Sequence, residues 1–229
     1  MGTVKTEQLN KSLLSNGTSI NLLEDISLDI GKGLTAINGP SGSGKSTLLN
    51  IIGGLDRATS GLVQVNGMNL ATLDEEGLAS YRRRHIGFIF RNYNLLPVLN
   101  VYENITFPLE LDSRLADREY IMQIASLLQI EDKMSLLPNI LSGGEKQKVA
   151  IARALAIKPA LILADEPTGS LDSFTSLEVI GLLKMTIKEF NQAVVIVTHD
   201  QEIAELADRI IHLRDGRVER IDEKRKKNN

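Results

Sequence analysis

Three continuous apolar runs set the expected architecture of the chain. The runs GLTAING (33–39), ALILADE (160–166) and AVVIVTHD (193–200) are short and contain β-branched residues. Unbroken runs of this kind are typical of strands in a parallel sheet that is covered on both faces. Each run ends in polar residues, and an open α/β sheet binds its ligand at the carboxyl ends of its strands. The pattern therefore predicts an α/β core with a ligand site at that edge.

Two alternating stretches in the first third of the chain predict a second sheet. INLLEDISLDI (20–30) and GLVQVNGMNL (61–70) alternate apolar and polar residues, as half-buried strands do. We expect them to form an antiparallel sheet beside the main one.

The middle of the chain, from about 92 to 158, changes to a helical period. Tyr120 to Gln129 carries apolar residues at helical spacing. Another helix is expected after Ser142, because Glu145 follows three residues later in a capping-box pattern. The simplest architecture is a core built from both ends of the chain with a helical insert between them.

Composition removes several classes of function. The 229 residues have a net charge of −3, with 42% hydrophobic and 24% charged residues, which is ordinary for one large soluble domain. No overall basic field argues for a nucleic-acid partner. The absence of cysteine excludes disulfides and cysteine metal sites. The apolar runs are shorter than the roughly 20 residues that a membrane span requires.

The segment GPSGSGKST (39–47) fits the phosphate-binding pattern G-x-x-x-x-G-K-[ST] and lies between a predicted strand and a predicted helix. Its glycines let backbone N–H groups surround phosphates without Cβ clashes, and the helix adds its positive N-terminus. Lys45 supplies charge to the β- and γ-phosphates, and the Ser46 hydroxyl ligates Mg²⁺. The candidate phosphate-binding residues are Gly39, Pro40, Ser41, Gly42, Ser43, Gly44, Lys45, Ser46 and Thr47.

Two acidic residues and one histidine follow the other predicted core strands. Asp165 is placed to bind Mg²⁺ directly or through water, because this cation prefers oxygen ligands. Glu166 is a candidate to polarise a water for attack on the γ-phosphorus. His199 is a candidate to orient the γ-phosphate and that water. The competing interpretations are a pair of loop carboxylates that cap a helix and an ordinary loop histidine.

The segment LSGGEKQKVAIARAL (141–155) resembles the signature motif of ATP-binding cassette ATPases. The phosphate loop, LSGGE, LILADEP (161–167), SLD (170–172) and TH (198–199) occur in the order of that family. The resemblance covers the chain from about Val4 to Val218. It implies an ATPase that uses ATP and Mg²⁺, with Glu166 and His199 as catalytic residues.

The resemblance also implies a dimer of two copies around two ATP molecules. The signature of one copy would meet the γ-phosphate held by the phosphate loop of the other, and Asp172 would lie near the interface. The implied signature contacts are Ser142, Gly143, Gly144 and Glu145.

The implied fold is a single nucleotide-binding domain over residues 1–229. It is α/β, with a P-loop NTPase core of mainly parallel sheet, an N-terminal antiparallel β-subdomain and an inserted α-helical subdomain. The core and β-subdomain are expected at about 1–91 and 159–219, the helical subdomain at about 92–158, and a basic tail at 220–229.

Finer similarity points to the macrolide-export, lipoprotein-release and bacitracin-resistance branch of the family. The resembling segments are GLDRATSGLVQVNG (54–67), the stretch around NYNLLPVLNVYENI (92–105) and ADEPTGSLDS (164–173). In that branch the ATPase works with an integral-membrane permease. The implied protein is cytoplasmic and peripheral on the inner face of the cell membrane, serving export of or resistance to an antimicrobial peptide, drug or lipid-linked substrate. Residues 93–109 are the expected docking surface, and a plain buried core is the alternative for the apolar side chains of NLLP and FPLE.

Two other functions compete with transport. An ATPase of a permease-linked sensing complex would have the same sequence features. A soluble DNA-repair-type cassette would carry a very long coiled coil before the signature, whereas only about 50 residues separate Arg91 from that motif here.

Several positions depart from the family pattern, including Gly33 in place of a Glu and Lys148 in place of an Arg. Two further departures bear on the nucleotide site. The segment KSLLSNG (11–17) has leucines where the family has an aromatic residue that stacks on adenine, so we expect weaker or less selective adenine binding. Arg91 stands in place of a Gln that contacts Mg²⁺ and the attacking water. A guanidinium has no acceptor, so Arg91 either points away and serves structure or docking, or approaches the γ-phosphate as an extra cation. Both alternatives predict slower hydrolysis than in an Arg91→Gln variant.

Overall fold

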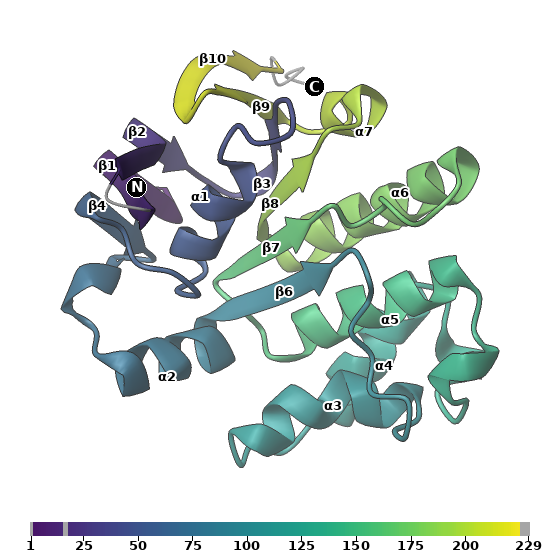
Figure 1. Cartoon of the computed structure of the whole chain (residues 1–229). Helices are drawn as coiled ribbons and strands as arrows, with labels where there is room; N and C mark the ends of the chain where they lie inside the picture. The colour runs from purple at the N-terminus through teal and green to yellow at the C-terminus, as the bar shows by residue number, and fades with distance from the viewer. Residues whose placement is uncertain (1, 16–17, 225–229) are drawn as a thin grey trace.

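The computed structural model describes residues 2–15 and 18–224 and contains two sheets (Figure 1). The larger sheet has the strand order β10-β9-β3-β8-β7-β6. Its inner pairs β3–β8, β8–β7, β7–β6 and β3–β9 are parallel, and β9–β10 is antiparallel. The strands are β3 (Gly33–Asn38), β6 (Ile86–Phe90), β7 (Leu161–Asp165), β8 (Ala193–Thr198), β9 (Arg209–Arg214) and β10 (Arg217–Glu223).

The parallel strands form because their side chains are buried on both faces. All six residues of β8 are buried, as are the first four of β7. Two apolar clusters lie on the two faces of this sheet, and successive residues such as Val194 and Val195 point into different clusters. The three expected strands are confirmed as a contiguous parallel set, β3-β8-β7.

The second sheet is antiparallel and has the order β2-β1-β4-β5. Its strands are β1 (Val4–Ser15), β2 (Thr18–Ile30), β4 (Ser60–Val65) and β5 (Met68–Asn69). The two expected stretches contribute β2 and β4, but they do not pair with each other. They flank β1, which the alternation pattern did not predict.

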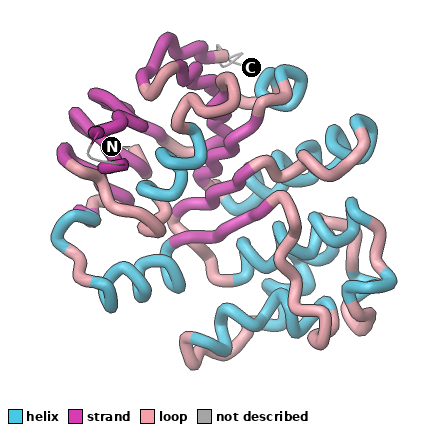
Figure 2. Tube along the Cα trace, viewed as in Figure 1, coloured by secondary structure: helices cyan, strands magenta, loops and turns pink. Residues whose placement is uncertain are grey.

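The segment between β6 and β7 is helical and lies to one side of the main sheet (Figure 2). It contains α3 (Val101–Leu111), α4 (Arg118–Leu127), α5 (Gly143–Ala156) and the short 3₁₀ turns Glu131–Lys133 and Pro138–Ile140. The remaining helices are α1 (Lys45–Ile52), α2 (Glu75–His85), α6 (Ser173–Phe190) and α7 (Gln201–Glu205), with a 3₁₀ turn at Leu70–Thr72. The expected mixture of core, antiparallel sheet and helical insert is confirmed as the fold class.

One expected boundary is wrong. The basic tail was expected from residue 220, but β10 continues to Glu223 and pairs with β9 through that residue. Residues 225–229 of that tail lie outside the described residues. Among residues 2–15 and 18–224, no helix combines the length and apolarity needed to cross a membrane.

Candidate nucleotide site

The phosphate loop joins β3 to α1 and requires its glycines for physical reasons. Gly42 and Gly44 have φ angles of +79° and +96°, a region that side chains disfavour. A Cβ on Gly39 would lie 2.0 Å from the Leu213 carbonyl oxygen. The loop is therefore free to present its backbone to a ligand only with glycine at these positions.

The first turn of α1 has the properties of an anion site. Its N-cap is Gly44, and no side chain caps its free N–H groups, which carry the positive end of the helix dipole. The Lys45 ammonium lies against the loop and donates to the carbonyls of Gly39 at 2.8 Å and Pro40 at 2.7 Å. Burial lowers the pKa of Lys45. A fixed cation, free N–H groups and an open backbone together suit a polyphosphate.

The two expected magnesium ligands come from different parts of the chain and face each other. Ser46 is the second residue of α1, Asp165 ends β7, and the Ser46 Oγ donates to the Asp165 Oδ1 at 3.2 Å. Burial raises the pKa of Asp165, opposed mainly by this hydrogen bond. A hydroxyl and a carboxylate suit Mg²⁺, which takes one or two protein oxygens and completes its shell with phosphate and water.

Glu166 and His199 lie together at the same sheet edge. The His199 Nδ1 is 2.7 Å from the Glu166 Oε1, and the imidazole is 66% exposed. Glu166 has a φ of +48°, which is unusual for a residue with a side chain. Local strain of this size is typical of functional positions. The two candidates for catalysis thus share a hydrogen bond and face solvent beside Asp165.

The signature segment forms the start of α5 with a complete capping box. The Ser142 Oγ accepts from the Glu145 backbone N–H at 3.3 Å, and the Glu145 carboxylate accepts from the Ser142 N–H at 2.8 Å. That second bond is the main reason why the pKa of Glu145 is lowered. Lys133 lies 3.6 Å from the same carboxylate. Glu145 therefore orders the helix start, where Ser142 is exposed, Gly143 is half-buried and Gly144 is buried.

The signature lies apart from the phosphate loop of the same chain. A Cβ on Gly144 would lie 2.7 Å from the Thr175 side chain, which places the signature beside the start of α6. Asp172 caps that helix and accepts from the Thr175 N–H and hydroxyl. Within residues 2–15 and 18–224, no hydrogen bond joins Ser142–Glu145 to Gly39–Thr47. The chain therefore carries two separate groups of phosphate-binding character.

Comparison with known proteins gives this arrangement a family. The ABC transporter model matches residues 23–169, which is more than half of the chain. The chain belongs to the ABC transporter family. It is 43% identical over 224 residues to an uncharacterized ABC transporter ATP-binding protein, MJ0796 of Methanocaldococcus jannaschii, with 95% of both chains covered. A structure titled as the dimeric post-hydrolysis state of that cassette bound to ADP and Pi superposes with a TM-score of 0.84 at 41% identity, covering 96% of this chain and 98% of that one.

The chain is also 44% identical over 218 residues to the macrolide export ATP-binding/permease protein MacB 1 of Yersinia pestis. That match covers 94% of this chain but 33% of the relative, so the chain spans about a third of that protein's length. These relatives confirm the expected branch of the family. The cassette is an ATPase whose cofactors are ATP and Mg²⁺.

The adenine side of the cassette lacks an aromatic residue in the β1–β2 hairpin. Leu13 is 48% exposed and Leu14 is 85% exposed, while Lys11 turns inward and bonds to Asp56 at 2.6 Å. The exposed apolar side chains described in this hairpin are therefore aliphatic, with Ile20 opposite Leu13 in the register and 49% exposed.

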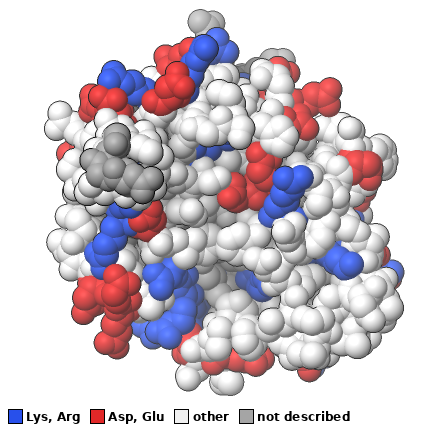
Figure 3. Space-filling model, viewed as in Figure 1, with Lys and Arg blue, Asp and Glu red and all other residues white. Residues whose placement is uncertain are grey.

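A groove lies where the helical segment meets the main sheet. It has a volume of about 260 Å³ and is lined by Arg82, Arg83, Ile86, Gly87, Phe88, Phe90, Asn94, Pro108, Arg153, Ala154 and Ile157. The rings of Phe88 and Phe90 stack at 5.6 Å. Figure 3 shows basic side chains gathered over the end of α2 on this face. The groove therefore combines an apolar floor with guanidinium groups.

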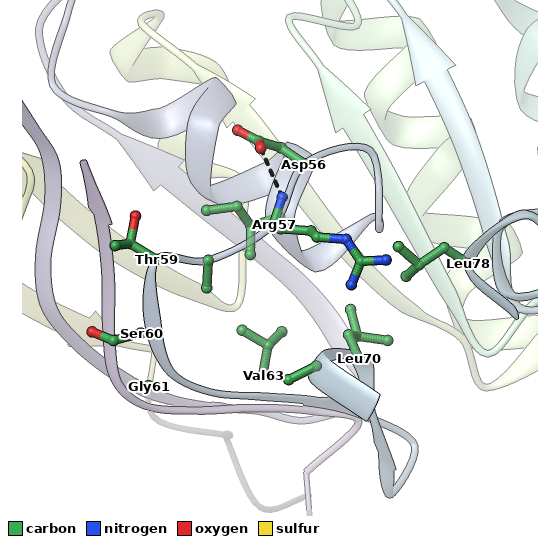
Figure 4. A pocket seen from close by; sticks show the side chains of 11 residues that line it. Asp56, Arg57, Thr59, Ser60, Gly61, Val63, Leu70 and Leu78 are labelled. Atoms are coloured by element: carbon green, nitrogen blue, oxygen red, sulfur yellow. Dashed lines mark hydrogen bonds between the residues drawn. The ribbon is translucent and has the colours of Figure 1, made fainter. Parts of the chain in front are cut away.

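A smaller cavity of about 200 Å³ lies in the antiparallel part of the cassette (Figure 4). It is lined by α1, β4 and α2 residues and by the loop that contains Asp56 and Arg57, where the Arg57 N–H donates to Asp56 at 2.7 Å. None of the expected site residues lines it.

Sequence reasoning missed a set of contacts around Arg91. The Arg91 Nη2 donates to the Gly169 carbonyl at 2.8 Å, and Ser170 bonds to both the Arg91 carbonyl and the Tyr93 hydroxyl. The guanidinium is thus turned toward Gly169. No local pattern reveals these contacts, because the partners are almost 80 residues apart.

Proposed function

We propose that this chain is the ATP-hydrolysing subunit of an ABC transporter and that two copies enclose two ATP molecules. The main support for this proposal is that the groups suited to bind phosphate lie in two separate places within one chain. A phosphate loop, Asp165, Glu166 and His199 share one sheet edge, while the signature presents a second helix N-terminus beside α6. Two copies in head-to-tail symmetry bring each signature to the other copy's phosphate loop.

Each side chain has a role that its contacts support. Loop N–H groups and Lys45 bind the β- and γ-phosphates. Ser46 and Asp165 hold Mg²⁺, which neutralises charge on the phosphates. Glu166 accepts a proton from the attacking water, and His199, already 2.7 Å from that carboxylate, orients the water and the γ-phosphate.

The second copy supplies the remaining contacts to the γ-phosphate. Ser142 and the backbone of Gly143 and Gly144 lie at the N-terminus of a 14-residue helix, where N–H groups favour an anion. Glu145 acts within its own chain by holding this turn in shape through the capping box. Cleavage of the bond to the γ-phosphoryl group, followed by release of inorganic phosphate, removes the group that both copies contact and lets them separate.

Glu166→Gln tests the dimer directly. This variant keeps the shape of the side chain but removes the proton acceptor, so we expect it to bind ATP without hydrolysis and to accumulate as a dimer. Light scattering of the purified chain measures the mass with ATP, with ADP and without nucleotide. Lys45→Ala in the same background is the control and is expected to stay monomeric. A Glu166→Gln protein that stays monomeric at saturating ATP contradicts the sandwich.

The groove between the helical segment and the main sheet is the proposed docking site for a cytoplasmic segment of an integral-membrane permease. In the adjoining helical segment, whose Asn94 and Pro108 line the groove, Val98 is 82% exposed, and Leu96 and Leu111 are also exposed. A MacB relative carries its permease in the same chain, as its name states. The cassette would thus be cytoplasmic and attached to the inner membrane face, and the permease would export an antimicrobial peptide, drug or lipid-linked compound.

Co-purification from detergent-solubilised membranes tests the docking site. The tagged chain should retain one integral-membrane protein of permease type, identified by mass spectrometry. Val98→Asp should reduce its recovery, whereas Met185→Asp, at an exposed position of α6, should not. Recovery that is equal for both variants contradicts docking at this surface, and a sensor kinase in the complex favours sensing over transport.

A further inference from the structure

Arg91 joins the loop after β6 to the segment that follows β7. Its Nη2 donates to the Gly169 carbonyl at 2.8 Å, and the Ser170 Oγ donates to the Arg91 carbonyl at 2.9 Å. The side chain and the main chain of one residue are therefore both bound to the same short segment.

The guanidinium occupies space that only glycine leaves open. A Cβ on Gly169 would lie 2.9 Å from the Arg91 Nε and 3.2 Å from its Cδ. Gly169 does not have a positive φ, so its backbone conformation does not demand glycine. Room for the Arg91 side chain is thus the constraint that the structure places on this position.

The clamped segment runs from Glu166 to Asp172 and behaves as a connected unit. The Gly169 N–H donates to the Glu166 carbonyl at 3.0 Å, and the Leu171 N–H donates to the Thr168 carbonyl at 3.0 Å. One end carries the carboxylate that meets His199, and the other end caps α6. A displacement of Gly169 would therefore shift both Glu166 and Asp172.

The same loop is bound to the signature helix on its other side. Arg153 of α5 donates to the carbonyls of Tyr93 at 2.7 Å and Asn94 at 2.5 Å. The Tyr93 hydroxyl lies 3.1 Å from the Ser170 Oγ, and a Cβ on Gly143 would lie 3.0 Å from that hydroxyl. Residues 91–94 thus connect α5 to the Glu166–Asp172 segment through hydrogen bonds.

We propose that Arg91 is a positioning residue that clamps the Glu166–Asp172 segment to the loop after β6. A displacement of α5 then moves the carboxylate of Glu166 through Arg153, the loop and the guanidinium. This inference rests on the proposed ATPase mechanism for its consequence, while the clamp itself is a property of the isolated chain. Arg91 contacts neither the phosphates nor the metal in this account.

Two variants remove the clamp by different routes. Arg91→Met removes the donor, and Gly169→Ala keeps the charge but displaces the side chain by the new Cβ. Gly181→Ala in α6 is the matched control, because a Cβ there meets nothing within 4 Å. Hydrogen exchange of the peptide that covers residues 166–172 is measured in the nucleotide-free chain. We expect about threefold or faster exchange in both clamp variants and no change in the control.

The double variant and steady-state kinetics complete the test. Because both substitutions break one contact, Arg91→Met with Gly169→Ala should exchange no faster than either single variant. Each of the two single variants, Arg91→Met and Gly169→Ala, should lower kcat by a similar factor and leave the KM for ATP within about twofold of the unmodified value. Arg91→Lys, which retains a donor, should recover part of the exchange protection.

Three outcomes overturn the proposal. Exchange of the 166–172 peptide could remain unchanged in both variants, or the two effects could add in full. Loss of ATP affinity in Arg91→Met alone would show that the guanidinium binds phosphate instead. Because the exchange measurement needs neither nucleotide nor dimer, its result stands separately from the test of the ATP sandwich.

Discussion

At the residue scale, Leu13 stands where the resemblance to ATP-binding cassettes leads us to expect the adenine contact. It lies in the β1–β2 hairpin, is about half exposed, and offers an apolar side chain without a π face. Stacking of a base on an aromatic ring contributes about 1–3 kcal/mol in nucleic-acid systems. We therefore expect the cassette to depend more on phosphate contacts than a relative with an aromatic residue does.

Leu13→Tyr should tighten ATP binding about fivefold to tenfold and raise the preference for ATP over GTP. The control is Leu14→Tyr, because the neighbouring residue points to the other face of the strand and is 85% exposed. Nucleotide affinities are measured by fluorescence titration or calorimetry. Equal affinities of the Leu13→Tyr and unmodified chains would show that the base does not lie against this residue.

Arg91→Gln should hydrolyse ATP faster than the unmodified chain when the permease is present. The amide oxygen restores an acceptor that can contact Mg²⁺ and the attacking water, which a guanidinium lacks. Comparison with Arg91→Met isolates this gain, because both variants lose the clamp to Gly169 and only Gln adds an acceptor. A phosphate-release assay gives the rates. A Gln variant that is no faster than the unmodified chain contradicts this explanation.

At the scale of the element, we expect the start of α5 to affect both the stability of the fold and the ATP-driven dimer. Ser142→Ala should lower the free energy of unfolding by about 1 kcal/mol through loss of the cap, and should also abolish ATP-driven dimerisation. Asn100→Ala is the matched control, because Asn100 and Glu103 form the same capping box at α3. The control should lose similar stability and keep the dimer. Denaturant unfolding and light scattering measure both, and equal dimerisation in the two variants would place the signature outside the site.

Elements with strong local signals were predictable from sequence. Continuous apolar runs identified β3, β7 and β8, and the Ser142–Glu145 spacing identified the start of α5. β1 was not predicted, because its pairing register with β2 shifts after Thr6, near Gln8 with its φ of +46°. The buried residues of β1 therefore do not follow a two-residue alternation. α2 was not predicted, because only Leu78 and Tyr81 of this helix are buried and they give a weak helical pattern. Its position depends on a tertiary bond from the Tyr81 hydroxyl to the Ile52 carbonyl at 2.7 Å.

Some features of the candidate site were also predictable from the sequence, and others were not. Motifs identified the phosphate loop, Asp165 and Glu166 because they follow predicted strands whose carboxyl ends meet at one edge. The bond from Ser46 to Asp165 and the clamp from Arg91 to Gly169 join residues far apart in the chain. Such contacts follow from the strand order β3-β8-β7-β6, which the runs alone do not fix.

At the scale of the whole molecule, the proposed function assigns two incomplete halves of one site to a single chain. The phosphate loop lies at the carboxyl edge of the main sheet, and the signature lies at the start of α5 beside α6 (Figure 1). In the proposed dimer, a head-to-tail pair of chains would complete two sites at once, whereas a monomer would complete none. We therefore propose that each active site is composite.

Complementation between two inactive variants tests this claim most directly. Ser142→Arg keeps the phosphate loop and blocks the signature, while Lys45→Ala keeps the signature and weakens the phosphate loop. Each variant alone should be inactive, because every site in its homodimer has one defective half. An equal mixture should recover up to about a quarter of the unmodified ATPase rate, since half of the dimers are mixed and each holds one intact site of two. A mixture that stays inactive, although its mixed dimers form, would contradict the account, as would full activity of either variant alone.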